Sequence, residues 1–139
     1  MQQNKQQDKQ RKEWIGIDLD RTLAHFDYNR WKIDKHYIGE PIREILERTK
    51  MVIKQGKRVK IFTARASNGE DTEYIRTWLK KNGLPGDLEI TNIKDWDMIE
   101  LWDDAVKQVI PNSGIFIEDI VNGLIHERKI IKKTLDKSI

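Results

Sequence analysis

The stretch WIGIDLDRTLAHFD, residues 14–27, joins a short apolar run to three aspartates, Asp18, Asp20 and Asp27. The apolar run predicts a buried strand over residues 14–18. Two carboxylates two positions apart at the end of such a strand repel each other, and burying them costs several kcal/mol unless a cation or a proton compensates. The sequence therefore predicts that this strand end either is open to water or holds a positive charge.

Apolar strand patterns alternate with helical patterns along the rest of the chain. Strands are predicted at residues 58–62, 88–91, 98–102 and 107–110, and helices from Pro41 to a stop at Gly56, over 70–81 and over 115–135. Residues 21–40 show no clear period and predict an aromatic-rich loop or small flap. The alternation predicts an α/β fold with a mostly parallel sheet, in which ligands bind outside the carboxyl ends of the strands.

The length of 139 residues is that of one domain. Residues 1–12 are polar and predict a disordered tail, followed by a single domain over residues 13–139. The formal net charge is +3, and much of the excess lies in residues 1–12 and 128–133. These basic ends favour solubility, or attraction to a polyanion such as nucleic acid.

Several classes of protein are disfavoured by composition. The chain has no cysteine, which excludes disulfides, thiolate metal sites and cysteine nucleophiles. Its three histidines, His25, His36 and His126, show no metal-ligand spacing. No apolar run approaches the roughly 18 residues of a membrane span, and the Gln-rich start does not resemble a signal peptide. We therefore expect a cytoplasmic protein with no membrane partner.

Polar side chains are predicted to meet at the carboxyl edge of the sheet. They are Asp18, Asp20, Thr63, Lys94, Asp103 and Asp104. Four carboxylates beside one lysine favour a hard divalent cation with oxygen ligands, and Mg²⁺ is the common choice. A carboxylate near that cation can act as a nucleophile, and a hydroxyl and an ammonium can donate to phosphate oxygens. The set predicts a phosphoryl-transfer site.

Four motifs in this order resemble those of the haloacid-dehalogenase-like (HAD) phosphatases. DLDRTL resembles the first motif, Asp-x-Asp-x-Thr after an apolar strand, and KIFTAR the second. Lys94 is the candidate for the third motif, and ELWDD resembles the fourth. The chain is most similar to small phage and bacterial members with GEPI, IFTAR, TN-x-KD and ELWDD stretches, over about residues 14–114. The resemblance implies a Rossmann-like three-layer sandwich without a large cap domain.

The resemblance also implies a mechanism for a phosphoric monoester hydrolase. Asp18 would attack phosphorus and become an aspartyl phosphate, while Asp20 would protonate the leaving oxygen and then activate water. Thr63 would hydrogen-bond the phosphoryl group, and Lys94 would offset negative charge. Mg²⁺ would be held by Asp18, the backbone carbonyl of Asp20, and Asp103, with support from Asp104.

Several assignments remain open at this stage. Thr22, Arg65 and Arg21 are the candidate substrate-binding residues. Arg21 stands where the family usually has glycine, and it either contacts a substrate anion or points to solvent. Arg65 either touches phosphate or forms a surface salt bridge. Lys60 and Lys107 are alternatives to Lys94, but one lies inside a strand and the other beyond the acidic pair.

The substrate is expected to be a nucleotide or another small phosphomonoester. Phe26, Tyr28 and Trp31 in the flap either stack on a base or pack the core of the flap. An enzyme acting on nucleic-acid ends and a non-catalytic module that binds a nucleotide or partner are the alternatives. Asp27 is interpreted as a loop residue. The apolar stripe of helix 115–135 either packs on the sheet or forms a dimer contact, so monomer and dimer both stay open.

Overall fold

The computed structural model describes residues 12–137, so the predicted tail falls almost entirely outside the described residues. The chain divides into two compact units, Met1–Asp104 and Ala105–Ile139. The prediction of one domain over residues 13–139 stays a prediction.

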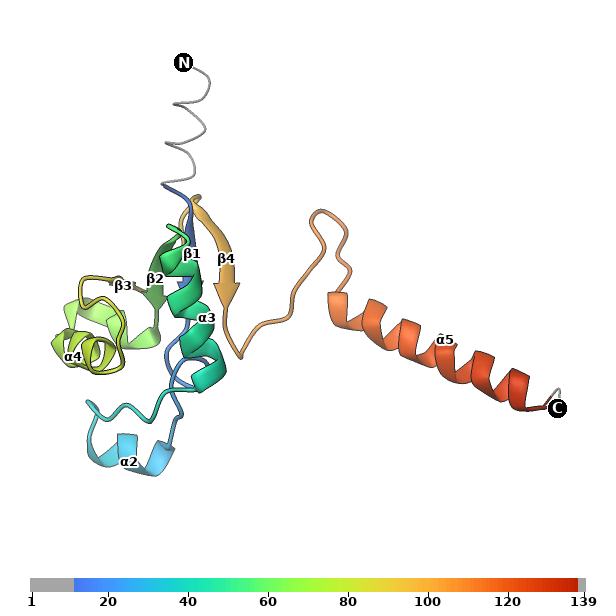
Figure 1. Ribbon diagram of the computed structural model, residues 1–139, viewed down its shortest axis with the longest axis horizontal. Coiled ribbons are helices and arrows are strands. Elements are labelled where there is room, and N and C mark those ends of the chain that lie inside the picture. The colour runs from blue at the N-terminus through green and yellow to red at the C-terminus, as the bar shows by residue number, and fades with distance from the viewer. Residues whose placement is uncertain (1–11, 138–139) are drawn as a thin grey trace, which may run out of the picture. The chain divides into compact units, whose positions relative to one another are not determined.

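The first unit is built on a four-stranded, all-parallel sheet (Figure 1). Its strands are β1 (Trp14–Ile17), β2 (Arg58–Phe62), β3 (Glu89–Thr91) and β4 (Met98–Trp102), in the order β3-β2-β1-β4. Every residue of β1 is buried, as its continuous apolar run predicts for an inner strand. Ile17 is level with Ile61 and with Trp102. The residues that follow β1, β2 and β4 therefore start at the same edge.

The helical elements connect these strands. They are α2 (Tyr28–Ile33), α3 (Arg43–Lys54), the 3-10 helix η1 (Ala64–Gly69) and α4 (Glu73–Lys81). Pro41 does not open α3 as predicted, because it pairs with Ala24 in an antiparallel bridge. Gly56 does follow the end of α3, with a φ of 84° that favours glycine. η1 begins directly after Thr63, the residue that follows β2.

The core lies on one face of the sheet. Alternate residues of β1 and β2 point to it, and they pack with α3 and α4 through one cluster that includes Ile15, Ile17, Val59, Ile61, Leu46, Ile75 and Leu79. Within residues 12–104 both of these longer helices thus cover the same face. The α/β class and the parallel sheet are confirmed, while the third layer of the sandwich stays a prediction.

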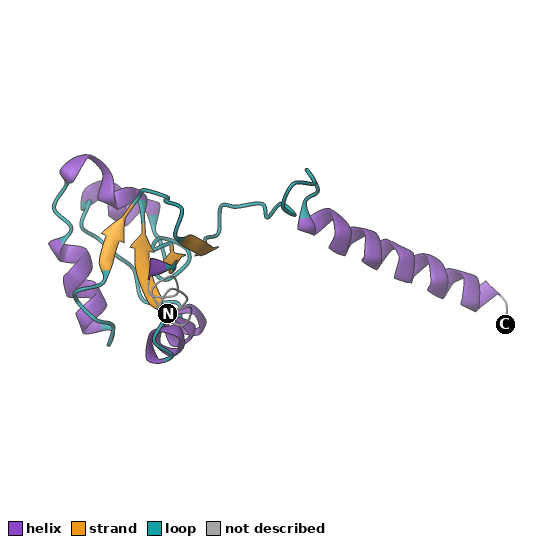
Figure 2. Cartoon of the chain, turned by 90° about the horizontal axis from the view of Figure 1, so that it is seen from above, coloured by secondary structure: helices purple, strands orange, loops and turns teal. Residues whose placement is uncertain are grey.

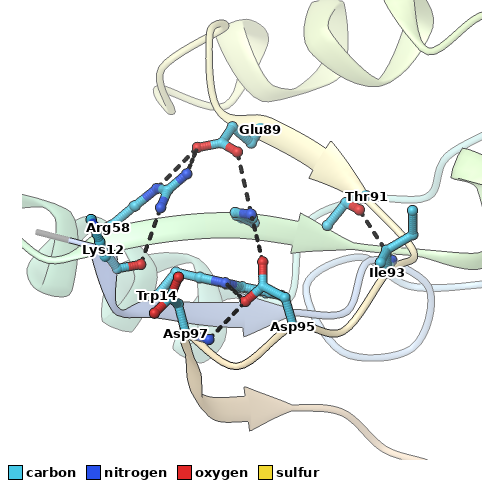
Figure 3. Close-up of polar contacts among 9 residues, drawn as sticks. Lys12, Trp14, Arg58, Glu89, Thr91, Ile93, Asp95 and Asp97 are labelled. Carbon is cyan, nitrogen blue, oxygen red and sulfur yellow. Dashed lines mark hydrogen bonds and ion pairs between the residues drawn. The ribbon is translucent and has the colours of Figure 1, made fainter. Parts of the chain in front are cut away.

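The other face of the sheet carries a charged network (Figure 3). The Trp14 indole N–H donates to Asp95 Oδ1 over 2.8 Å, and Lys60 Nζ lies 3.7 Å from Asp95 Oδ2. Arg58 donates to Glu89 Oε1 through two nitrogens, at 2.6 and 3.0 Å. Segment 92–97 therefore crosses from the carboxyl end of β3 to Trp14 at the amino end of β1.

The second unit contains a loop and one long helix, α5 (Ile117–Lys137), shown in purple in Figure 2. The prediction of a strand at residues 107–110 was wrong, since within the described part of the second unit this segment forms no strand but an isolated antiparallel bridge between Val109 and Phe116. The turn PNSG brings these neighbouring segments back together, with φ values of 60° at Asn112 and 70° at Gly114. No residue of α5 is buried within its own unit, and the partner of its apolar stripe stays a prediction.

No helix among the described residues is long and apolar enough to cross a membrane.

Candidate functional site

Three aspartates gather at the carboxyl edge of the sheet in the first unit. Asp18 follows β1, and its backbone N–H donates to the carbonyl of Trp102 over 2.9 Å. This pairing places Asp18 beside Asp103 and Asp104, which follow β4. One carboxylate oxygen from each of the three lies within 4.8 Å of the others. The predicted meeting of these three residues is therefore seen in the structure.

The hydroxyl of Thr22 links two of these aspartates. It donates to Asp18 Oδ2 over 3.1 Å and lies 3.3 Å from Asp104 Oδ1. It also accepts from the backbone N–H of Asp104 over 3.1 Å. The buried Thr22 side chain thus positions the acidic cluster; a direct role in substrate binding stays a prediction.

The environment of Asp18 favours its neutral form. The pKa of Asp18 is raised from 3.8 to about 7, mainly by burial and then by the charge of Asp103 and the contact with Asp104, while the hydrogen bond from Thr22 lowers it. A group that is this costly to ionise is well suited to a divalent cation. Three carboxylate oxygens are also the ligand type that Mg²⁺ prefers, so the residues fit the predicted metal.

Asp20 does not join the acidic cluster through its carboxylate but pairs with Arg65. Arg65 Nε donates to Oδ2 over 2.7 Å and Nη2 to Oδ1 over 2.8 Å. The same guanidinium donates to two flap carbonyls, that of Lys35 over 3.0 Å and that of Tyr37 over 2.7 Å. Because the side chain of Arg65 is only 7% exposed, it acts as a buried clamp on Asp20 and the flap.

The sequence did not indicate that Arg65 acts as a clamp on Asp20 and the flap. Arg65 stands two residues after Thr63, a spacing compatible with phosphate contact, but its donors are directed at Asp20 and at backbone carbonyls. Carbonyl acceptors carry no signature in a sequence, since every residue has one. The role of Arg65 in binding substrate stays a prediction.

Thr63 lies at the same edge, directly after β2. Its backbone N–H donates to the carbonyl of Thr91 over 2.9 Å, and its side chain caps η1 by accepting from the Arg65 N–H over 3.1 Å. The side chain is buried. Thr63 thus lies at the end of β2, caps η1 and orients the backbone that leads to Arg65.

Lys94 is exposed and lies in the crossing segment on the charged face. Its neighbour Asp95 already contacts Trp14 at the amino end of β1 (Figure 3). Within residues 12–104, the cations that pair with Asp20 and Asp104 are Arg65 and Arg21. The assignment of Lys94 as the charge-offsetting residue stays a prediction. Lys60 contacts Glu89 and Asp95 on the charged face.

Lys107, the other alternative, pairs with Glu118 over 2.9 Å inside the second unit.

Arg21 has a left-handed backbone, with a φ of 70°. This is the conformation that glycine adopts most cheaply, and glycine is what the HAD motif usually has at this position. The Arg21 side chain is 65% exposed, and its Nε lies 3.2 Å from Asp104 Oδ2. The arginine therefore adopts the turn that glycine would supply and adds a positive charge beside the acidic cluster.

Two substitutions of Arg21 are expected to separate the effect of its backbone conformation on stability from the effect of its charge. Arg21→Gly relieves a left-handed strain of about 1 kcal/mol but loses an exposed ion pair and gains unfolded-state entropy, so stability changes by less than about 1 kcal/mol. Arg21→Val forces a β-branched residue into this conformation and costs about 2 kcal/mol. Urea unfolding measures both, with the exposed helical Arg48→Val as the control. Equal stability of the two Arg21 variants would contradict the backbone argument.

Asp27 is a helix cap rather than a plain loop residue. Its Oδ1 accepts from the backbone N–H groups of Asn29 and Arg30, at 3.0 and 3.3 Å, and begins α2 inside the flap. An aspartate directly before a short run of helix-compatible residues is a cap signal that the sequence does carry.

Comparisons with protein-family models, with curated proteins and with solved structures find no significant match to this chain.

Proposed function

We propose that this chain is a Mg²⁺-dependent phosphomonoesterase of HAD-like type that acts on a nucleotide or another small phosphomonoester. The observation that carries the proposal is the cluster of Asp18, Asp103 and Asp104 at the carboxyl edge of a parallel sheet. Asp20 stands two residues after Asp18, oriented by its own arginine. The four motifs that resemble HAD phosphatases supply the assignment of roles.

Asp18, Asp103 and Asp104 are the residues that would hold the metal. Bound there, Mg²⁺ would offset the charge of the carboxylates and of the phosphate oxygens. Arg21, beside Asp104, adds a second positive charge at this edge. Both charges favour the approach of a phosphate dianion to carboxylates that would otherwise repel it.

The chemistry proceeds in two displacements at phosphorus. A carboxylate oxygen of Asp18 bonds to phosphorus while the bond to the ester oxygen breaks, and that oxygen takes a proton from Asp20. Water then attacks phosphorus, its proton passes to Asp20, and the bond from phosphorus to Asp18 breaks. Inorganic phosphate and an alcohol are the products, and Asp20 must exchange at least one of its bonds to Arg65 during the cycle.

The left-handed backbone at Arg21 favours an enzyme over a non-catalytic binding module. A residue other than glycine at this position would favour a module if it changed the turn and so displaced Asp20. With a φ of 70°, Arg21 retains the conformation that glycine would supply. The loop from Asp18 to Ala24 closes accordingly, with the N–H of Ala24 donating to the carbonyl of Leu19 over 2.8 Å.

Hydrolysis of an aryl phosphate with and without Mg²⁺ tests the proposal. We expect turnover only with the metal, and in Asp103→Asn we expect the Mg²⁺ concentration for half-maximal rate to rise roughly tenfold or more. Asp87→Asn, an exposed aspartate outside the site, is the control and keeps the wild-type Mg²⁺ dependence. Turnover that persists after complete removal of divalent cations would overturn the proposed mechanism.

A further inference from the structure

A pocket of about 590 Å³ opens beside Asp20 and Arg65. It lies between the flap, η1 and α4, and its volume is within the range of sites for small organic ligands. A smaller hollow of about 360 Å³ is lined by residues such as Glu13 and Lys57, at the amino end of β1 and β2, away from the acidic cluster. The larger pocket is therefore the one that a molecule with its phosphate at the aspartates would enter.

Aromatic rings line this pocket from two elements. Phe26 and Trp31 come from the flap, with ring centroids 6.0 Å apart, and Tyr74 comes from α4. All three side chains are half-buried, so part of each ring stays accessible. His36 stacks on Tyr74 with centroids 4.2 Å apart and planes within 3°, which fixes the orientation of that ring. The pocket thus presents aromatic rings in fixed orientations, as the binding of a flat ring requires.

Polar groups also line the pocket. Lys35 Nζ lies 3.5 Å from the centroid of the Trp31 ring, and Ser67 and Glu70 contribute a hydroxyl and a carboxylate. A ligand here meets aromatic faces together with a few donors and acceptors. A nucleobase has this combination, with a π-face on each side and hydrogen-bonding groups on its edge.

We infer that this pocket binds the base of a nucleoside phosphate whose phosphate lies at Asp18, an inference that rests on the proposed function. The pocket shares Asp20 with the site of chemistry, so sugar and base would extend directly from the reacting phosphate into it. Its volume is larger than a single phenyl ring requires, which favours a sugar with a base over a simple aryl phosphate. Trp31 is the main stacking residue, and the base takes the place of the Lys35 ammonium over its ring face, where Nζ now lies 3.5 Å from the centroid. The displaced ammonium then contacts the edge of the base.

The test compares nucleoside monophosphates with ribose 5-phosphate, which has the same phosphate and sugar but no base. We expect kcat/KM to be at least about tenfold higher for the nucleotide, as stacking on one aromatic residue predicts. In Trp31→Ala we expect this ratio to fall roughly tenfold. Trp96→Ala is the matched control, since Trp96 is a fully exposed tryptophan in the segment between β3 and β4 and does not line the pocket; the ratio stays at the wild-type value.

Each outcome decides the inference. Equal kcat/KM for nucleotide and ribose 5-phosphate, or an equal loss in Trp96→Ala and Trp31→Ala, would overturn it while leaving the phosphatase intact. If no phosphate ester is hydrolysed, the proposed function fails, and calorimetric titration with adenosine decides the pocket separately. Binding of adenosine that Trp31→Ala abolishes would support the base site, and the absence of binding to wild type would overturn it.

A second arm distinguishes a free nucleotide from the end of a nucleic acid. Both present the same terminal base and phosphate, so a phosphorylated dinucleotide is assayed beside the mononucleotide. A higher kcat/KM for the dinucleotide assigns the site to nucleic-acid ends, and a lower one to free nucleotides. In both cases the evidence for the base site is the preference for nucleotide over ribose 5-phosphate, measured as the ratio of kcat/KM values, and its loss in Trp31→Ala.

Discussion

Asp18→Asn is expected to abolish turnover and, in the absence of metal, to make the protein more stable at neutral pH. Hydrolysis should fall by at least about a thousandfold, because the amide cannot replace a carboxylate nucleophile. The gain in stability has a separate origin, in the cost of ionising a carboxyl that is buried beside Asp103 and Asp104. Opposite effects on activity and stability are the mark of a site residue.

The pH dependence follows from the raised pKa of Asp18, which is about 7 against 3.8 for the free group. Between these two values the folded state holds a proton that the unfolded state has released, so the free energy of unfolding falls as pH rises. The fall ends above about pH 7, where both states are ionised. At about 1.4 kcal/mol per unit the shift corresponds to a little over 4 kcal/mol, and because Asp18 is only half-buried, screening by solvent reduces the expected loss to about 2–4 kcal/mol. The asparagine variant does not show this loss.

Urea unfolding from pH 5 to pH 8, with the metal removed, measures this difference. Asp27→Asn is the matched control, because asparagine caps a helix about as well as aspartate and Asp27 lies outside the acidic cluster. Mg²⁺ should restore the stability of the wild type at pH 8 but have little effect on Asp18→Asn. A wild type whose stability rises steadily from pH 5 to pH 8 would contradict the proposed environment of Asp18.

Arg65→Lys is expected to cost about 2–3 kcal/mol of stability and to lower kcat more than it changes KM. Lysine cannot reproduce the planar fork that binds both oxygens of Asp20 and two flap carbonyls, so buried acceptors lose their partners. A misplaced Asp20 protonates the leaving oxygen poorly. The loss of kcat should therefore be at least about tenfold larger for an alkyl phosphate, which needs that proton, than for an aryl phosphate.

Arg58→Lys is the control for this substitution. Arg58 also binds one carboxylate through two nitrogens, but its side chain is 37% exposed and it lies on the charged network away from Asp20. We expect a loss of stability below about 1 kcal/mol and unchanged kinetics. If Arg65→Lys lowers the rates of alkyl and aryl phosphates equally, the arginine stabilises the fold without positioning Asp20.

Much of the fold was predictable because short, mainly apolar runs specify strands. β2 and β4 have the predicted bounds, and β1 differs by one residue. Only β1 is buried along its whole length and reads as a continuous apolar segment, while β2 carries Arg58 and Lys60 and the edge strand β4 is partly exposed. The segment 107–110 has a similar pattern, but a turn pairs it with its own neighbour in an isolated antiparallel bridge. A pattern of side chains identifies a strand-like segment without identifying its partner.

The candidate site also has a part that the sequence predicts and a part that it does not. Asp18, Asp103 and Asp104 were predicted together because strand ends in a parallel sheet share an edge, and the structure brings them together. The partner of Asp20 was not predictable, since it depends on backbone carbonyls of a flap that carries no periodic signal. The position of Lys94 depends on where the crossing segment turns. The neighbouring Asp95 holds this segment against Trp14, and the spacing of residues in the sequence does not indicate such a tertiary contact.

The Arg65 guanidinium makes the flap and Asp20 parts of one hydrogen-bonded unit. A molecule that enters by lifting the flap must break the bonds to the carbonyls of Lys35 and Tyr37, and the same movement loosens the hold on Asp20. Entry and release of the proton donor then become a single equilibrium, and coupling of this kind is reciprocal. Breaking the bonds between Arg65 and Asp20 raises the affinity for the entering molecule by the same factor by which binding of that molecule favours the broken bonds. Molecules too small to displace the flap do not gain this affinity.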